Sequence, residues 1–233
     1  MNTNSERIRR DLRAVADPSK AVIMQRFFKT GQGQYGEGDF FIGVTVPQSR
    51  NIARSHQLCD LRTVGELLRS KVHEERLVAL LILVHKYGSG EKGIVEFYLE
   101  NLHHVNNWDL VDLTAPNILG AHLFNKSRSS LYRLARSKKL WEKRVAIVAT
   151  QYFIRKSDFG DTLKIAEILL SDKHDLIHKA VGWMLREVGK RDLNALETFL
   201  GRHYKKMPRT TLRYAIERMP EKKRKFYLSV ESR

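Results

Sequence analysis

The chain has very little cysteine and no long apolar run. Cys59 is the only cysteine among 233 residues, which excludes an internal disulfide framework and a thiolate-rich zinc site. No apolar stretch approaches the roughly 18 residues that cross a bilayer, and the N-terminal sequence lacks the apolar core of a signal peptide. We therefore expect a soluble, cytoplasmic protein in which Cys59 is a small buried apolar residue.

Strand patterns are nearly absent as well. Only FFIGVTV, at Phe40 to Val46, could form a short strand, and helical spacing of apolar residues recurs almost everywhere else. Helix starts are marked by residues such as Asp17-Pro18, Val46-Pro47 and Asp60. The sequence predicts an all-α protein with about a dozen helices joined by short connections.

Negative charge is in the minority. The chain has 42 Lys and Arg against 26 Asp and Glu, which gives a formal net charge of +16. This excess is spread along the whole sequence and repels itself, so it points to a polyanionic partner. We expect this partner to be nucleic acid, and an anionic membrane surface is the second candidate.

A similar helix start recurs along the chain. A cation followed by small apolar residues occurs at Arg76, Arg144, Lys179 and Arg213, with a period of roughly 34 residues whose first step is doubled. NNWDLVDL fills the middle of that double step. We predict one domain over residues 1–233, an α-solenoid of about six HEAT-like helical hairpin repeats, curved with a basic concave face.

Three of the predicted helices set tryptophan, carboxylate or cationic groups apart from their apolar stripe: NNWDLVDL (106–113), LWEKRVAI (140–147) and IHKAVGWMLREVGK (177–190). In NNWDLVDL, Trp108 and Asp112 project from one side, while Leu110 and Leu113 occupy the other and Val111 flanks them. In IHKAVGWMLREVGK (177–190), the buried stripe and the opposite side are distinct. The stripe consists of Ala180, Val181, Met184, Leu185 and Val188, and the opposite side of Lys179, Trp183, Arg186 and Lys190. An exposed Trp among cations indicates a binding surface.

One segment breaks the helical pattern. Thr30 to Gly43 contains five glycines and must be a mobile or tightly turned loop. It has no G-K-[ST] sequence, which argues against a nucleotide-binding P-loop. Two interpretations remain open, a glycine-rich connection without a role and a loop that approaches DNA.

With these residues in view, the sequence resembles the AlkD family of bacterial DNA glycosylases, HEAT-like repeat proteins that remove cationic N3- and N7-alkylated purines. The likeness runs from Asp17 to Phe28 and Phe40 to Arg50 as far as KAVGWMLREVGK, and it is strongest in WDLVD, KRVAI and GWMLRE. It covers most of the chain. The three motifs are specific in combination, because a scaffold that merely folds does not need them together.

The resemblance implies a role for each matching residue. Asp112 matches the catalytic aspartate, Trp108 a tryptophan that packs against the deoxyribose, and Trp183 the second indole at that site. Arg144 matches an arginine that grips the damaged strand. Phe27 falls where some relatives have a tyrosine near the DNA. The remaining expected phosphate contacts are Arg76, Arg155, Lys179, Arg186, Lys190 and Arg213.

The implied activity is that of a monofunctional 3-methyladenine/7-methylguanine-type DNA glycosylase. It would act as a monomer on duplex DNA, without a cofactor, a metal or base flipping. Two alternatives remain open: a catalytically silent DNA- or RNA-binding solenoid, and a HEAT scaffold for an acidic protein. Without the resemblance, Asp112 reads as a solvated surface group, and Trp108 and Trp183 read as packing between repeats. His174 and His178 have no third ligand spaced to join them.

Overall fold

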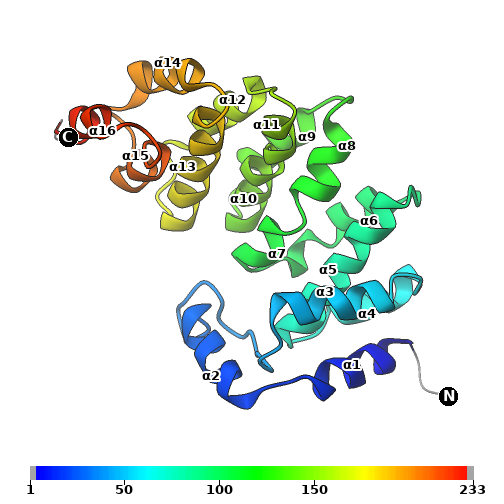
Figure 1. Cartoon of the computed structure of the whole chain (residues 1–233). Coiled ribbons are helices and arrows are strands. Elements are labelled where there is room, and N and C mark those ends of the chain that lie inside the picture. Colours follow the sequence, from blue (N-terminus) through cyan, green and yellow to red (C-terminus); the bar gives the residue numbers. More distant parts are fainter. Residues whose placement is uncertain (1–3, 230–233) are drawn as a thin grey trace. The chain divides into compact units, whose positions relative to one another are not determined.

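A computed structural model of the chain describes residues 4–229 (Figure 1). Helices make up all of its regular structure, so the predicted all-α class is confirmed. The short strand expected at Phe40 to Val46 is wrong: among the described residues there is no strand, and Phe40 forms only an isolated bridge with Val72. The chain divides into two compact units, Met1–Thr114 and Ala115–Arg233.

The N-terminal unit is organised around one buried helix, α5. This helix contacts α1, α3, α4, α6 and α7. Most of its side chains are buried, including Leu77, Ile82 and Leu83, so it forms the core of the unit. The elements of the unit are α1 (Asn4–Ala14), α2 (Pro18–Phe27), α3 (Val46–Ser55), α4 (Leu61–Leu68), α5 (His73–Gly88), α6 (Ile94–Glu100), a 3₁₀ turn (Leu102–His104) and α7 (Trp108–Asp112).

The predicted helix starts in this unit are confirmed. The carboxylate of Asp17 accepts hydrogen bonds from the backbone N–H groups of Ser19 and Lys20 at the start of α2. Asp60 accepts one from the N–H of Thr63 at the start of α4. Helix α3 begins at Val46, directly after its N-cap Thr45. Each cap satisfies donors that a helix end leaves without a partner.

The glycine-rich segment is fastened at its C-terminal end to α5. The buried carboxylate of Glu74 accepts hydrogen bonds from the backbone N–H groups of Ile42 (3.0 Å), Gly43 (2.8 Å) and Val44 (3.2 Å). Gly43 has a φ of +83°, and a Cβ there would lie 2.0 Å from the carbonyl oxygen of Asp17. Only glycine fits this position, because its backbone is left-handed and another segment lies against it.

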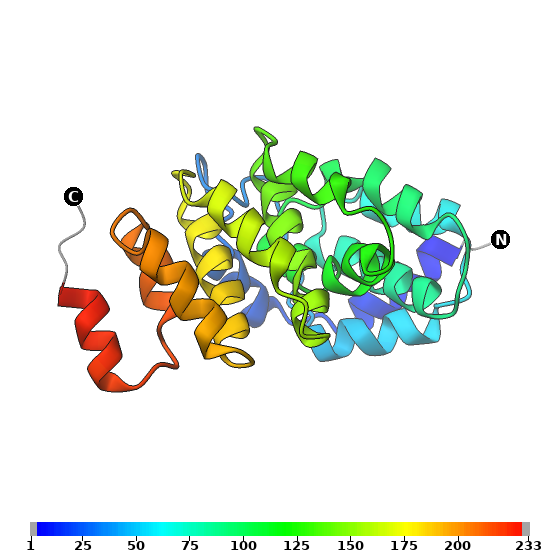
Figure 2. The same ribbon diagram turned by 90° about the horizontal axis from the view of Figure 1, so that it is seen from above.

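The C-terminal unit is built from helices that pack on their neighbours in sequence. Its elements are a π-turn (Pro116–Gly120), α8 (Ala121–Leu123), α9 (Ser129–Ala135), α10 (Leu140–Ala149), α11 (Gln151–Arg155), α12 (Gly160–Leu169), α13 (Asp175–Gly189), α14 (Leu193–His203), α15 (Arg209–Ala215) and α16 (Glu221–Ser229). Helix α10 packs on α9 and on α13, and α13 packs on α12, α14 and α15. Figures 1 and 2 both show α10 and α13 side by side.

The predicted repeat register is visible in this unit. Arg144, Lys179 and Arg213 are each the fifth residue of their helices, α10, α13 and α15. These helices are neighbours in space, so the unit is solenoid-like. The number of repeats, the single domain over 1–233 and the basic concave face stay predictions.

Helices α13 and α15 approach closely because of Gly182. A Cβ at Gly182 would lie 2.5 Å from Cβ of Tyr214 and 2.6 Å from the carbonyl oxygen of Thr211. The adjacent Val181 and Met184 belong to the predicted stripe, and all five residues of that stripe are buried. In residues 4–229 no helix is both long and apolar enough to cross a membrane.

Candidate functional site

Helix α7 carries the Trp–Asp pair that the sequence singles out. It spans only Trp108 to Asp112, and Asn107 caps it, with Oδ1 accepting from the N–H of Trp108 (2.8 Å). Leu110 and Val111 are fully buried, whereas Trp108 and Asp112 are half-buried. The predicted division of this helix into a core side and a Trp–Asp side is confirmed for Leu110, but Leu113, expected on the core side, is half-buried just beyond the helix end.

Aromatic side chains from the end of α2 surround Trp108. The ring of Phe28 stacks on the indole with centroids 5.1 Å apart, and the ring of Phe27 meets it edge-on at 5.9 Å. Phe28 is buried, but Phe27 is 62% exposed. Val22 and Ile23 on α2 are exposed too, and no residue of this helix is buried. The indole therefore borders an apolar surface that is open to solvent and includes Phe27, whose contact with DNA stays a prediction.

The other end of α7 is held by a buried hydroxyl pair. Oγ1 of Thr114 donates to the carbonyl oxygen of Leu110 (2.5 Å) and lies 3.2 Å from the hydroxyl of Tyr98. Burial, assisted by the charge of Asp112, raises the pKa of Tyr98 far above its usual value, against the lowering effect of the Thr114 hydrogen bond. Tyr98 is therefore neutral, and it adds no negative charge next to the Asp112 carboxylate.

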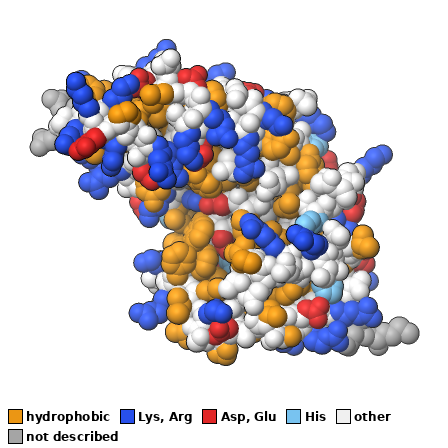
Figure 3. Space-filling view, in the orientation of Figure 1, with side chains coloured by type: hydrophobic (Ala, Val, Ile, Leu, Met, Phe, Trp, Pro, Cys, Tyr) orange, Lys and Arg blue, Asp and Glu red, His pale blue; other side chains and the backbone are white. Residues whose placement is uncertain are grey.

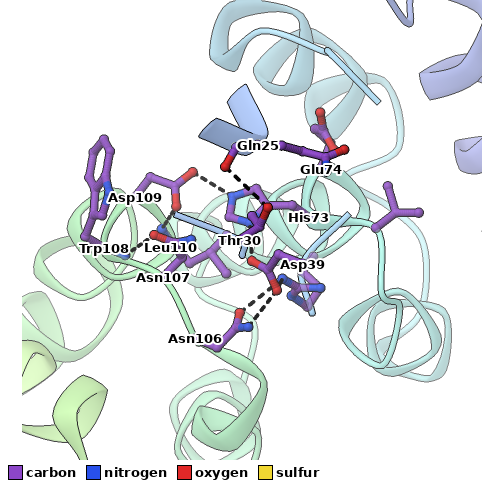
Figure 4. A network of polar contacts seen from close by, with 12 residues as sticks. Gln25, Thr30, Asp39, His73, Glu74, Asn106, Asn107, Trp108, Asp109 and Leu110 are labelled. Atoms are coloured by element: carbon purple, nitrogen blue, oxygen red, sulfur yellow. Dashed lines mark hydrogen bonds and ion pairs between the residues drawn. The ribbon is translucent and has the colours of Figure 1, made fainter. Parts of the chain in front are cut away.

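A buried charged network lies beside Trp108 (Figure 4). The imidazole of His73 contacts two carboxylates, with Nδ1 2.9 Å from Oδ2 of Asp39 and Nε2 2.8 Å from Oδ2 of Asp109. Asp39 comes from the glycine-rich segment, His73 begins α5 and Asp109 follows Trp108 in α7. Burial alone lowers the pKa of His73, but Asp109 and Asp39 outweigh burial and raise it to about 9, with Arg76 opposing the rise.

Arg76 belongs to this network, which corrects the expectation that it lies on a phosphate-binding surface. Its side chain is buried. Nη2 donates to Oδ1 of Asp39 (2.6 Å) and to Oδ1 of Asn106 (3.0 Å), and Nη1 donates to the carbonyl oxygen of Ser70 (2.7 Å). Burial raises the pKa of Asp39, but hydrogen bonds and positive charge from His73, Arg76 and Asn106 outweigh burial, and the net result is a lowered pKa. Asp39 is therefore ionised.

In the C-terminal unit, the predicted binding residues of α13 lie off its buried stripe. Trp183, Lys179 and Arg186 are half-buried, and Lys190 is exposed. Lys179 pairs with Asp175 (2.8 Å), Arg186 with Glu217, and Lys190 with Glu187 (2.8 Å). Pairs at a surface contribute little to stability, so a phosphate can replace the carboxylate at small cost.

The other predicted phosphate contacts differ in exposure. Arg155 and Arg213 are exposed, and Arg155 donates to Oε1 of Gln151 (2.7 Å). Arg144 is buried, with Nη1 donating to the carbonyl oxygen of Leu176 (2.6 Å). Lys and Arg side chains are spread over the face of the C-terminal unit that Figure 3 shows.

The structure brings together some of the predicted site residues within each unit. Phe27, Trp108 and Asp112 belong to the N-terminal unit, whereas Trp183 and Arg144 belong to the C-terminal unit. Their predicted convergence on one site, and the DNA contacts themselves, stay predictions. Among residues 4–229, no group of three or more His, Cys, Asp or Glu side chains is arranged to hold a metal ion.

Except for Arg76, sequence reasoning missed the residues of the buried network, namely Asp39, His73 and Asp109. His73 stands in an HEE sequence that is not a metalloprotease motif, and Asp39 is one of many polar residues in the glycine-rich segment. Asp109 lies inside the WDLVD motif itself, beside the tryptophan. Two signals were available in the sequence. One is the second acid in the WDLVD motif, and the other is the run of four ionisable residues that opens α5, a helix otherwise rich in apolar residues.

Comparison with known proteins identifies one family by its sequence model. The family model for DNA alkylation repair enzymes matches residues 8–219. A solved structure described as a predicted DNA alkylation repair enzyme from Enterococcus faecalis is similar to this chain, with a TM-score of 0.70 and 15% sequence identity. The match covers 88% of this chain and 97% of the other, and at that identity it shows the fold alone. No curated protein matches. Because the family model spans most of its length, this chain belongs to the DNA alkylation repair enzyme family.

Proposed function

We propose that the protein is a DNA glycosylase that hydrolyses the N-glycosidic bond of cationic N3- and N7-alkylated purines in duplex DNA. The observation that carries the proposal is the Trp108–Asp112 pair. An indole and a carboxylate share one side of a single helical turn, next to an exposed apolar surface. The family assignment supports repair of alkylation damage, and the proposal narrows it to base removal.

The chemistry needs only one carboxylate. Alkylation at N3 or N7 gives the base a positive charge, so it leaves with the electrons of the C1′–N bond without prior protonation. The sugar becomes oxocarbenium-like as this bond stretches, and a fixed carboxylate stabilises the growing positive charge. We assign this role to Asp112, which also orients the water that adds to C1′. The products are the free base, an abasic site and a proton.

Trp108 and its aromatic neighbours provide the surface for the lesion. The face of the indole attracts a cationic sugar or base, and its bulk keeps water away, which strengthens the effect of the carboxylate. Phe27 extends this surface, and Trp183 stays the predicted second indole of the site. The lesion's own charge then provides selectivity without base flipping. The proposed reaction uses no cofactor.

Phosphate contacts hold the duplex in this proposal. Arg155 and Arg213 are exposed, and the surface pairs of Lys179, Arg186 and Lys190 can exchange a carboxylate for a phosphate. Such contacts are independent of sequence and sensitive to salt. Arg144 and Arg76 are both buried. Arg144 remains a proposed contact to the damaged strand because the resemblance assigns it that role, whereas Arg76 is left out because its guanidinium binds Asp39 and Asn106.

The test is single-turnover release of 7-methylguanine from duplex DNA by the native chain and by Asp112→Asn. We expect the variant to lose roughly a hundredfold or more in rate with little change in duplex affinity, because the carboxylate acts mainly in the transition state. Asp60→Asn is the matched control: it removes an exposed carboxylate in the same unit, and asparagine still caps the helix. Equal rates for Asp112→Asn and the native chain would remove Asp112 from the mechanism.

The same assay separates the alternatives. A catalytically silent nucleic-acid-binding protein retains salt-sensitive duplex affinity but releases no base. A scaffold for an acidic protein shows neither base release nor a steep dependence of duplex affinity on salt. We favour the enzyme, because neither alternative calls for a half-buried indole and carboxylate one turn apart.

A further inference from the structure

His73 is placed where both of its ring nitrogens face a carboxylate. Each contact, to Asp39 and to Asp109, is within hydrogen-bond distance, and the ring is 1% exposed. An ionised carboxylate only accepts hydrogen bonds, so both ring nitrogens must donate. The ring is therefore a buried imidazolium, and with Arg76 it balances the charges of the two aspartates.

We propose that His73 is a positioning residue whose imidazolium ties the glycine-rich segment to the first turn of α7 and thereby holds Trp108 and Asp112 in place. The inference rests on the function proposed above, since it concerns the site of that reaction. His73 itself is buried and does not touch the substrate.

Helix α7 depends on such support because it is short. It has five residues, whereas isolated helices shorter than about 12 residues are marginal in water. Asp109 is its second residue, adjacent to Trp108 and three positions before Asp112. A shift of Asp109 therefore moves the backbone that carries both groups.

The ring of His73 supports Trp108 by a second route. It stacks on Phe41, with centroids 4.3 Å apart, and packs against Phe28 at 5.4 Å. Phe28 in turn stacks on the indole of Trp108. Aromatic faces also stabilise the positive charge of the ring. His73 thus holds both the backbone next to Trp108 and the Phe28 ring that covers the indole of Trp108.

The charged groups around His73 set the pH range of this arrangement. Asp39 faces the ring from the glycine-rich segment, Asp109 from α7 and Arg76 from α5, while the Glu74 carboxylate is turned to the backbone N–H groups of residues 42–44. Loss of the ring proton leaves one carboxylate facing a lone pair and gives the cluster a net negative charge. With a pKa of about 9 for His73, the imidazolium persists through neutral pH.

The experiment compares the native chain with His73→Gln and with the control His56→Gln, which removes a single, partly exposed contact to Asp11. We expect His73→Gln to release 7-methylguanine roughly ten- to a hundredfold more slowly, because a small displacement of reacting groups has effects of that size. The affinity of His73→Gln for undamaged duplex should change less than about twofold. Acrylamide should quench the fluorescence of Trp108 more readily in this variant, and Trp108→Phe identifies which part of the fluorescence comes from Trp108. The control should match the native chain in all three measurements.

Two measurements do not depend on activity. Nitrogen-15 spectra of labelled histidine should show both His73 nitrogens protonated at about pH 8, and Asp109→Asn should lower the pH at which that proton is lost. Any one of three results overturns the inference. The His73 ring is neutral at about pH 8, Asp109→Asn leaves the pH of its proton loss unchanged, or the rate loss in His73→Gln only follows the unfolded fraction of that variant. If the native chain releases no base, the proposed function fails, and the ring protonation and the quenching of Trp108 still decide whether His73 positions α7.

Discussion

The buried charge of His73 should make the stability of the N-terminal unit fall at alkaline pH. The pKa of His73 is 6.5 in the unfolded chain and about 9 in the folded one. Each tenfold difference in proton affinity corresponds to about 1.4 kcal/mol, so the proton contributes about 3 kcal/mol to folding. Because the folded pKa is the higher one, this contribution is complete below about pH 6.5, decreases between 6.5 and 9, and is lost above about 9.

The assay is urea unfolding of the native chain and His73→Gln at about pH 6 and about pH 10, with amide hydrogen exchange in α5 reporting on the N-terminal unit. The gap in unfolding free energy between the two proteins should be about 3 kcal/mol larger at the lower pH. Comparing the gaps cancels the titration of lysines and tyrosines, which both proteins share. A gap of the same size at both pH values would show that His73 carries no buried proton and would refute the reasoning.

Further predictions concern packing, the glycine-rich segment and binding. Gly182→Ala should lower the unfolding free energy by about 1–3 kcal/mol, because the added Cβ meets the backbone of α15. Gly201→Ala should raise the unfolding free energy by about 0.5–1 kcal/mol, because open space surrounds Gly201 inside α14. Thermal unfolding measures both changes. Glu74→Gln should weaken three backbone hydrogen bonds and speed hydrogen exchange at residues 42–44, with a loss of about 2 kcal/mol in their protection. Arg213→Gln should reduce the slope of log affinity against log salt by about 1 for any duplex, and an unchanged slope would exclude a phosphate contact.

The local structure could largely be predicted from the sequence, because helix signals are short-range. Asp17 and Asp60 cap the helices that they were expected to cap, and Leu110 and Val111 are buried as the apolar spacing requires. Gly201 is an exception: glycine is unfavourable inside a helix, but α14 continues through it to His203, with the neighbouring Leu200 buried in the core. Tertiary packing overrode a local preference at that position.

The sequence by itself determined which residues lie on the Trp–Asp side of α7 and which form the stripe of α13, because helical periodicity depends only on spacing along the chain. Only the tertiary structure decided that Asp39, His73 and Asp109 meet, since these residues are more than thirty positions apart and no local pattern links them. It also decided that Arg76 is buried. The repeat spacing alone assigns its guanidinium to a surface, but in the folded chain it binds the buried carboxylate of Asp39, which needs positive partners because water is absent.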